Sequence, residues 1–201
     1  MYEHERAFAL GLADRAADVA LGLFRGDGLE VRRKADLTLV TQADTSIERM
    51  LREQIEAAFP GDRILGEEEG GSHDPSGRLW IIDPIDGTAN FAHGDRVWCV
   101  SIGLVWDGRP ELGLIAAPAL GETFLARRGK GATLNGRPIE PGSSYRVTLN
   151  DYLAVGGDGF TIAKQGTAPQ YGGYDADALF AFFRAHGPIG PLPLSRILRV
   201  N

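Results

Sequence analysis

Acidic side chains fall in three short segments of the sequence, each at the expected end of a helix or strand. Asp44 closes an extended segment, Glu67–Glu69 form a run of three carboxylates, and Asp83 and Asp86 directly follow the apolar residues "WII". Pro84 lies between the last two carboxylates, where it removes a backbone donor and stiffens the turn, so that both side chains can converge. Because carboxylate oxygens are the ligands that hard divalent cations prefer, these segments predict a metal site.

Gly87 and Thr88 follow Asp86 directly and are expected to open a short helix. Free N–H groups at the start of a helix can hold a phosphate, and a metal site beside an anion site suits the hydrolysis of a phosphate ester. Two simpler alternatives are a plain turn at "DPID" and a solvated loop at "GEEEG". The loop explains "GEEEG" by itself, whereas a turn does not explain why "DPIDGT" comes straight after an expected buried strand.

Two helices are expected before these motifs, and strands after them. Apolar residues recur at three- and four-residue spacing over residues 3–24 and again over 45–59, where Thr45 and Glu48 form a capping-box pattern. From residue 63 onward, short alternating runs separated by Gly, Pro and Asp predict about five or six strands, mostly linked by hairpins. The expected fold class is therefore α+β, with two N-terminal helices packed on one face of a mainly antiparallel sheet, followed by a small α/β C-terminal segment.

The C-terminal segment begins after the strongest linker signal, "EPGSS" at 140–144. We expect a strand there, with Tyr145, Val147 and Leu149 on one face, followed by the glycine loop "VGGDGF". A last helix is expected over about 176–186, with Asp175 as its N-cap.

Composition narrows the class of protein. The 201 residues carry a formal net charge of −6 and no basic block, which argues against nucleic acid as a partner. An acidic protein that handles an anionic substrate needs a cation between the like charges. No apolar run approaches the roughly 20 residues of a membrane span, and the charged N-terminus "MYEHERAF" differs from a signal peptide, so we expect a cytoplasmic protein without a membrane partner. The single cysteine, Cys99, excludes an internal disulfide and is expected to be a small core residue on a strand.

The motifs "GEE", "WIIDPIDGTANF", "CVSIGL" and "GKGATLNGRPI" together resemble the inositol monophosphatase family of metal-dependent phosphomonoesterases, over about residues 5–141. The resemblance implies that Glu67, Asp83 and the carbonyl of Ile85 hold a first Mg²⁺, and that Asp83 and Asp86 share a second among two or three ions. It also implies roles for four further residues: phosphate binding by Gly87 and Thr88, orientation and deprotonation of the attacking water by Thr88 with Asp44, and a basic side chain near the site from Lys34.

The implied reaction is an in-line attack by a metal-activated water, without a covalent intermediate. The sequence offers no convincing nucleophile, because Ser101 lies within an apolar strand, His93 has no evident acid partner and Ser46 fits a helix start. We expect all three residues to be structural.

The sequence departs from the family after residue 141. The family carries a "WDxAAG"-type motif there, whose aspartate completes the second metal site, and neither Asp151 nor Asp158 has a matching context. Instead, "YRVTLNDYLAVGGDGF" and "GGYDADALFAFFRAH" resemble the C-terminal end of the 5′-nucleotidase family over about 145–199. In that family the aromatic residue after "GGDG" stacks on a nucleobase, a role that would fall to Phe160; a tight glycine turn with Phe160 packed inward is the alternative.

These resemblances predict a metal- and phosphate-binding region at 1–141 joined to a separate segment at 142–201, as in a chimera. The leading functional hypothesis is a Mg²⁺-dependent phosphomonoesterase acting on a small phosphorylated alcohol such as inositol monophosphate, weakened by the missing ligand. Histidinol phosphate or a nucleotide is the alternative substrate, and a non-catalytic metal-, phosphate- or nucleoside-binding fragment is the alternative function. A homodimer is compatible with the family, and the unpaired half of the fold predicts low stability or self-association.

Overall fold

A computed structural model describes residues 2–26, 28–34, 38–74, 76–145, 147, 149, 151–159, 161–170, 180, 184 and 197–199. The chain divides into two compact units, one comprising Met1–Glu140 with Leu194–Asn201 and the other Pro141–Pro193. That the regions 1–141 and 142–201 derive from different families stays a prediction. No helix in the described ranges is long and apolar enough to cross a membrane.

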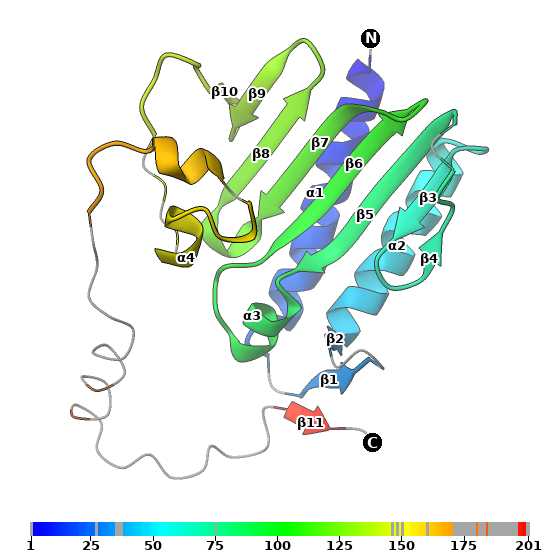
Figure 1. Cartoon of the computed structure of the whole chain (residues 1–201). Coiled ribbons are helices and arrows are strands. Elements are labelled where there is room, and N and C mark those ends of the chain that lie inside the picture. Colours follow the sequence, from blue (N-terminus) through cyan, green and yellow to red (C-terminus); the bar gives the residue numbers. More distant parts are fainter. Residues whose placement is uncertain are drawn as a thin grey trace. The chain divides into compact units, whose positions relative to one another are not determined.

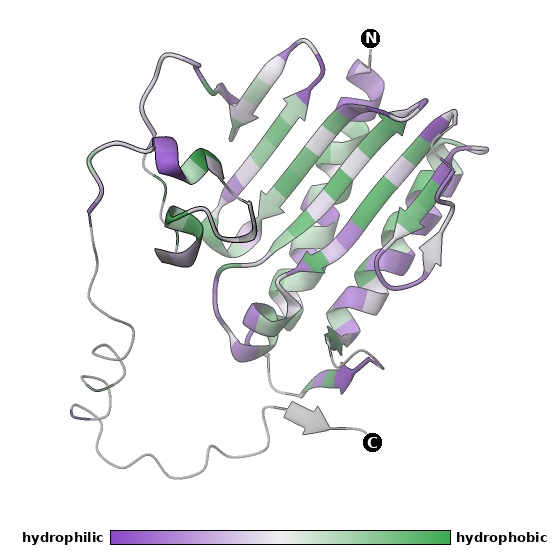
Figure 2. Cartoon of the chain, viewed as in Figure 1, coloured by the Kyte–Doolittle hydropathy of each residue, from purple (hydrophilic) through white to green (hydrophobic). Residues whose placement is uncertain are grey.

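The first unit is built on a large sheet whose strands follow the spatial order β10-β9-β8-β7-β6-β5-β3-β4. All neighbouring pairs are antiparallel except β3 and β5, which run parallel. The strand bounds are Arg63–Gly66 (β3), Gly70–Gly71 (β4), Arg78–Asp86 (β5), Cys99–Trp106 (β6), Arg109–Ala117 (β7), Glu122–Arg127 (β8), Gly131–Leu134 (β9) and Arg137–Pro138 (β10). This pairing confirms the mainly antiparallel sheet expected from the sequence, and apolar and polar residues alternate along its central strands (Figure 2).

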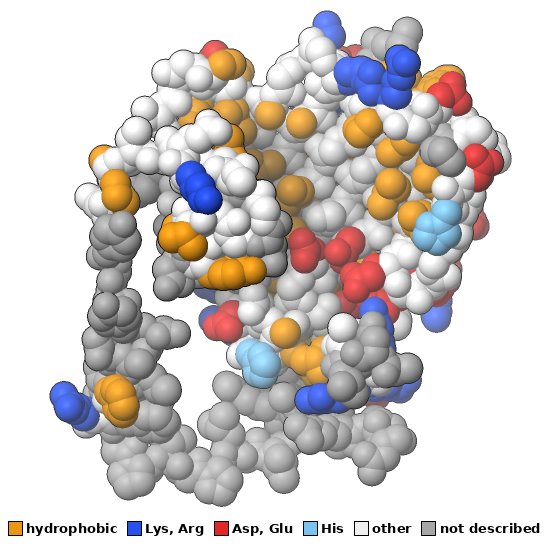
Figure 3. Space-filling model, viewed as in Figure 1, with side chains coloured by type: hydrophobic (Ala, Val, Ile, Leu, Met, Phe, Trp, Pro, Cys, Tyr) orange, Lys and Arg blue, Asp and Glu red, His pale blue; other side chains and the backbone are white. Residues whose placement is uncertain are grey.

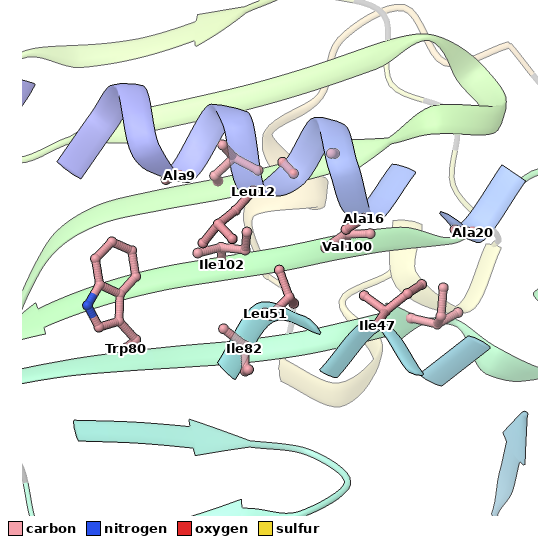
Figure 4. Close-up of a cluster of buried hydrophobic side chains, with 14 of the residues drawn as sticks. Ala9, Leu12, Ala16, Ala20, Ile47, Leu51, Trp80, Ile82, Val100 and Ile102 are labelled. Atoms are coloured by element: carbon pink, nitrogen blue, oxygen red, sulfur yellow. The ribbon is translucent and has the colours of Figure 1, made fainter. Parts of the chain in front are cut away.

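Two helices, α1 (Glu3–Leu23) and α2 (Gln42–Ala58), cover the same face of this sheet (Figure 1). Residues of α1 spaced three and four apart, including Leu12 and Ala16, face Val100 and Ile102 of β6 (Figure 4). Leu51 of α2 lies in the same fully buried cluster. Helical and strand periodicity therefore meet in one core, as the α+β prediction required.

The start of α2 differs from the prediction. The helix begins at Gln42, not near residue 45, and its capping box joins Thr41 with Asp44. The Thr41 hydroxyl accepts a hydrogen bond from the Ala43 amide at 3.1 Å, and the Asp44 carboxylate accepts one from the Thr41 amide at 2.8 Å. The predicted Thr45–Glu48 capping box is therefore wrong, and Asp44 lies inside the first turn of the helix.

Two strands of a small second sheet precede α2 in the chain. Its strands β1 (Leu29–Arg33), β2 (Leu39–Thr41) and β11 (Ile197–Arg199) follow the order β11-β1-β2, with β1 antiparallel to β2 and parallel to β11. The last residue of β2 is Thr41, the N-cap of α2, so this strand leads directly into the helix that carries Asp44.

The described part of the second unit contains short helical turns, α4 (Asp151–Ala154) and the 3₁₀ turns Gly157–Gly159 and Thr161–Gln165. The strand predicted at Tyr145, Val147 and Leu149 is wrong, because these residues lie in irregular backbone. The Tyr145 and Val147 side chains are 52% and 72% exposed, so their alternation reflects no buried face. Phe160 and most of the predicted helix at 176–186 lie outside the described residues.

Candidate active site

The end of strand β5 carries the predicted carboxylates on an irregularity of the sheet. Asp83 pairs with Ser101 and Asp86 with Cys99, so β5 has one residue more than β6 between these two positions. Pro84, which lacks an N–H, falls within this bulge. The bulge interrupts the alternation of the strand between Asp83 and Asp86.

Glu67 comes to the same place because β3 and β5 are parallel neighbours. Their register pairs Gly66 with Ile82, so Glu67, the first residue after β3, lies beside Asp83 of β5. A cavity of about 470 Å³ opens there, lined by Thr38, Leu39, Glu67, Asp83, Ile85, Asp86, Gly87, Thr88 and Ala89. All six residues predicted as metal or phosphate ligands therefore line one cavity, and Figure 3 shows acidic side chains gathered near the end of β5.

Asp83 is in an unfavourable environment for a carboxylate. Its Oδ1 atom is buried and has no hydrogen-bond partner among the described residues. Burial, then the neighbouring charges of Glu67 and Asp86, raise the pKa of Asp83 to about 7. A cation bound beside this side chain would offset both the burial and the neighbouring negative charges.

The donor set fits Mg²⁺, which takes carboxylate and carbonyl oxygens and retains several waters. Within the described residues, no group of three or more Asp, Glu, His or Cys side chains is assembled as a complete metal site. A metal ion bound here would therefore take part of its coordination from a main-chain oxygen and from water. The Ile85 carbonyl lies at the cavity wall, where the Thr88 hydroxyl can donate to it at 3.0 Å in place of Asp44.

Asp44 forms a hydrogen-bonded pair with Thr88, which lines this cavity. The Thr88 hydroxyl donates to Asp44 Oδ1 at 2.9 Å, and the other oxygen of Asp44 accepts from the amide and hydroxyl of Thr41 at 2.8 and 2.6 Å. Asp44 is fully buried, and burial raises its pKa although the hydrogen bonds from Thr41 and Thr88 oppose the shift. With its proton directed at Asp44, the Thr88 oxygen can accept a hydrogen bond from a water in the cavity.

Gly87 is the N-cap of the short helix α3 (Thr88–His93) and has a φ of 91°, in the left-handed region. A Cβ atom on Gly87 would lie 3.1 Å from the carbonyl oxygen of Val97. Glycine is thus required here both by the backbone angle and by the close approach of the following loop.

We expect Gly87→Ala to lower the free energy of unfolding by more than Gly121→Ala. Gly121 also has a positive φ, 69°, but a Cβ there meets nothing within 4 Å. Backbone strain of about 1–3 kcal/mol is therefore common to both variants, whereas the clash and the shift of the cavity wall belong to Gly87 alone. Urea denaturation compares the two variants, and equal losses of stability would contradict the close contact.

Lys34 lies beside the acidic segment, as predicted. Its Nζ atom is 2.8 Å from Glu68 Oε1 and 3.4 Å from Glu67 Oε1. Lys34 thus provides a positive charge at the side of the cavity where Glu67 is found.

Two features were missed or misjudged from the sequence. Glu48, read as a capping residue, is fully buried and binds the acidic segment through its side chain. Cys99 lies on a strand as expected but is only half-buried, with its Sγ atom 3.8 Å from Asp86 Oδ2. His93 is exposed at the end of α3, and the Ser46 hydroxyl donates to the Gln42 carbonyl in the first turns of α2, which agrees with their structural assignment.

The chain is similar in sequence to a known family of phosphatases. The model of the inositol monophosphatase family matches residues 1–156. The histidinol-phosphatases of Chlorobaculum parvum and Mycobacterium tuberculosis are each 46% identical over 132 residues, which make up 66% of this chain and 51% of each relative. The chain therefore spans about half the length of the curated relatives it matches.

A solved structure, that of the Thermotoga maritima IMPase, superimposes with a TM-score of 0.64 and 35% identity, covering 68% of this chain and 53% of that one. The family match extends into the segment read as 5′-nucleotidase-like, to residue 156, and the comparisons give no support to that second resemblance or to a chimera.

Proposed function

Because the chain belongs to the inositol monophosphatase family, we propose that it is a Mg²⁺-dependent phosphomonoesterase acting on a small phosphorylated metabolite. The observation that carries the proposal is the buried, unpartnered Oδ1 of Asp83 in a cavity shared with Glu67 and Asp86. An oxygen in this position costs stability unless a cation or hydrogen-bond donor meets it, and a bound cation would remove that cost.

Glu67, Asp83 and the carbonyl of Ile85 would hold a first Mg²⁺, and Asp83 with Asp86 a second, of the two or three ions expected. Bound there, Mg²⁺ would lower the pKa of a water and offset the negative charge of the phosphate. The described lining of the cavity holds three carboxylates, of which Asp83 and Asp86 alone would serve the second ion, so we propose that this ion is held weakly and that the activity of the chain is weak.

The chain's own residues supply the remaining steps. The amides of Gly87 and Thr88 would bind phosphate oxygens at the start of α3. The Thr88 oxygen would take a proton from the attacking water as its own proton passes to Asp44, to which it is hydrogen-bonded at 2.9 Å. The raised pKa of Asp44, caused by burial, favours acceptance of that proton.

Histidinol phosphate is the first substrate to test, since two histidinol-phosphatases share 46% identity with this chain. Inositol 1-phosphate is the second, because the same family includes inositol monophosphatases. Both are phosphate monoesters of small alcohols, which is the substrate class we propose.

Phosphate release from both compounds, with and without Mg²⁺, tests the proposal. The wild type and Asp18→Asn, an exposed charge change on α1, should release phosphate only with Mg²⁺, and Asp83→Asn should not. Absence of Mg²⁺-dependent release in a folded wild type would contradict an enzymatic function, and Mg²⁺ binding without release would favour a non-catalytic fragment.

A further inference from the structure

A buried carboxylate on α2 anchors the backbone of the acidic turn, defined here as residues Gly66–Gly70. Glu48 is fully buried. Its Oε2 atom accepts a hydrogen bond from the Glu68 amide at 2.7 Å, and its Oε1 atom accepts one from the Glu69 amide at 2.9 Å. One side chain thus satisfies two consecutive backbone donors of the turn.

Arg52, one helical turn further along α2, completes this anchor. Its Nε and Nη2 atoms donate to Glu48 Oε1 at 3.0 and 2.8 Å, and Nη2 also donates to the carbonyl of Gly70. Glu48 and Arg52 together therefore hold the backbone of residues 68–70 through three hydrogen bonds, two accepted by the carboxylate and one donated by the guanidinium.

Gly66, the residue before Glu67, packs against the same two side chains, Glu48 and Arg52. A Cβ atom on Gly66 would overlap the Glu48 carboxylate and the Arg52 guanidinium, so these groups lie directly against the Gly66 backbone. The backbone is therefore held at Gly66 and at Glu68, on either side of Glu67. The Glu67 side chain itself is 44% exposed and lines the cavity.

We propose that Glu48 and Arg52 are positioning residues that hold Glu67 in place to bind Mg²⁺ with Asp83; this rests on the metal site proposed above. A buried ion pair contributes little net stability, and apolar residues could pack α2 against the turn equally well. Groups that orient metal ligands change metal affinity by about 10–100-fold when they are removed. Packing alone does not require the Glu48–Arg52 ion pair, whereas positioning of Glu67 does.

The decisive variant is Glu48→Gln, which keeps the size of the side chain but cannot accept from both amides, because its NH₂ group is a donor. We expect the Kd for Mg²⁺, measured by titration calorimetry, to rise about tenfold or more. The matched control is Glu69→Gln, which removes the same charge from the turn itself while leaving both anchoring amides in place. Its 49% exposed side chain lies 3.7 Å from Arg52 Nε, so its Kd should change by less than about threefold.

Hydrogen exchange of the metal-free protein provides a readout independent of Mg²⁺. Peptides covering residues 66–70 should exchange faster in Glu48→Gln than in wild type or Glu69→Gln, with circular dichroism showing that each variant is folded. Should Glu48→Gln fail to fold, Arg52→Lys decides, since lysine keeps the charge but cannot span Glu48 and the Gly70 carbonyl. It should also weaken Mg²⁺ binding more than Glu69→Gln does.

Equal Kd values for Glu69→Gln and the folded anchor variant would overturn the positioning role and leave the metal site intact. A wild type that binds no Mg²⁺ would overturn the proposed function, and the positioning role with it. The wild-type titration distinguishes these two failures.

Discussion

Asp83→Asn is expected to make the metal-free protein more stable at pH 8 while abolishing its response to Mg²⁺. The asparagine carries no charge toward Glu67 and Asp86, and its amide can donate a hydrogen bond where the carboxylate cannot. After allowance for solvent screening of this partly exposed group, the expected gain is about 1–2 kcal/mol in the free energy of unfolding.

The gain in the free energy of unfolding of Asp83→Asn should increase with pH. The folded pKa of Asp83, about 7, lies above the ordinary value of 3.8, so the folded state binds more protons than the unfolded state between these values. The contribution of Asp83 to the free energy of unfolding of the wild type therefore falls as the pH rises from about 4 to 7. The difference between variant and wild type should be small near pH 4 and largest above pH 7.

Urea denaturation at a series of pH values, with EDTA and with Mg²⁺, measures this effect. Saturating Mg²⁺ should stabilise the wild type and leave Asp83→Asn unchanged. A variant that is less stable than wild type at pH 8 without metal, or that is stabilised equally by Mg²⁺, would contradict the role given to Asp83.

The second large effect is expected for Thr88→Val, which removes the hydroxyl but keeps the branched shape of the side chain. Loss of a group that relays a proton typically lowers kcat by about 100-fold or more, and the affinity for Mg²⁺ should change little because no proposed metal ligand is altered. The buried Asp44 loses one of its three hydrogen bonds, which should cost about 1–3 kcal/mol in stability.

Thr88→Ser is the matched control, since it retains the hydroxyl that bonds Asp44. Its kcat should stay within about tenfold of wild type, measured with Mg²⁺ and substrate at saturation. Similar losses in both variants would show that the methyl group, and not the proton path, matters at this position.

The core and the candidate site could largely be predicted because their signals are local. The run Trp80–Ile82 identifies a buried strand, and Pro84 with Gly87 marks the irregular backbone that follows it. The side-by-side position of Glu67 and Asp83, in contrast, has no local signal in the sequence. It depends on the parallel register of β3 and β5, which is fixed by packing across residues distant in sequence.

The start of α2 could not be predicted because the sequence contains two equivalent capping patterns. Thr41 with Asp44 and Thr45 with Glu48 share the same spacing. Tertiary contacts decide between them: Glu48 is engaged by the amides of Glu68 and Glu69, whereas Asp44 bonds the Thr41 amide. Glu48 binds backbone amides about 20 residues away, and no pattern in the neighbouring sequence predicts such a contact.

The C-terminal part was the least predictable, since alternation at Tyr145, Val147 and Leu149 specifies a strand only where a partner strand and a buried face exist. The expectation of low stability or self-association stays a prediction. It is consistent with Ile81 and Ile115 on the main sheet, whose side chains are 41% and 46% exposed.

Whether the end of β5 holds a metal ion is decided by titrating the metal-free wild type, Asp18→Asn and Asp83→Asn with Mg²⁺ in a calorimeter at pH 7.5. We predict saturable binding to the wild type and to Asp18→Asn, with release of protons as Mg²⁺ displaces them from Asp83, and no binding to Asp83→Asn. Equal binding by all three proteins, or none by the folded wild type, would contradict a metal site at the end of β5.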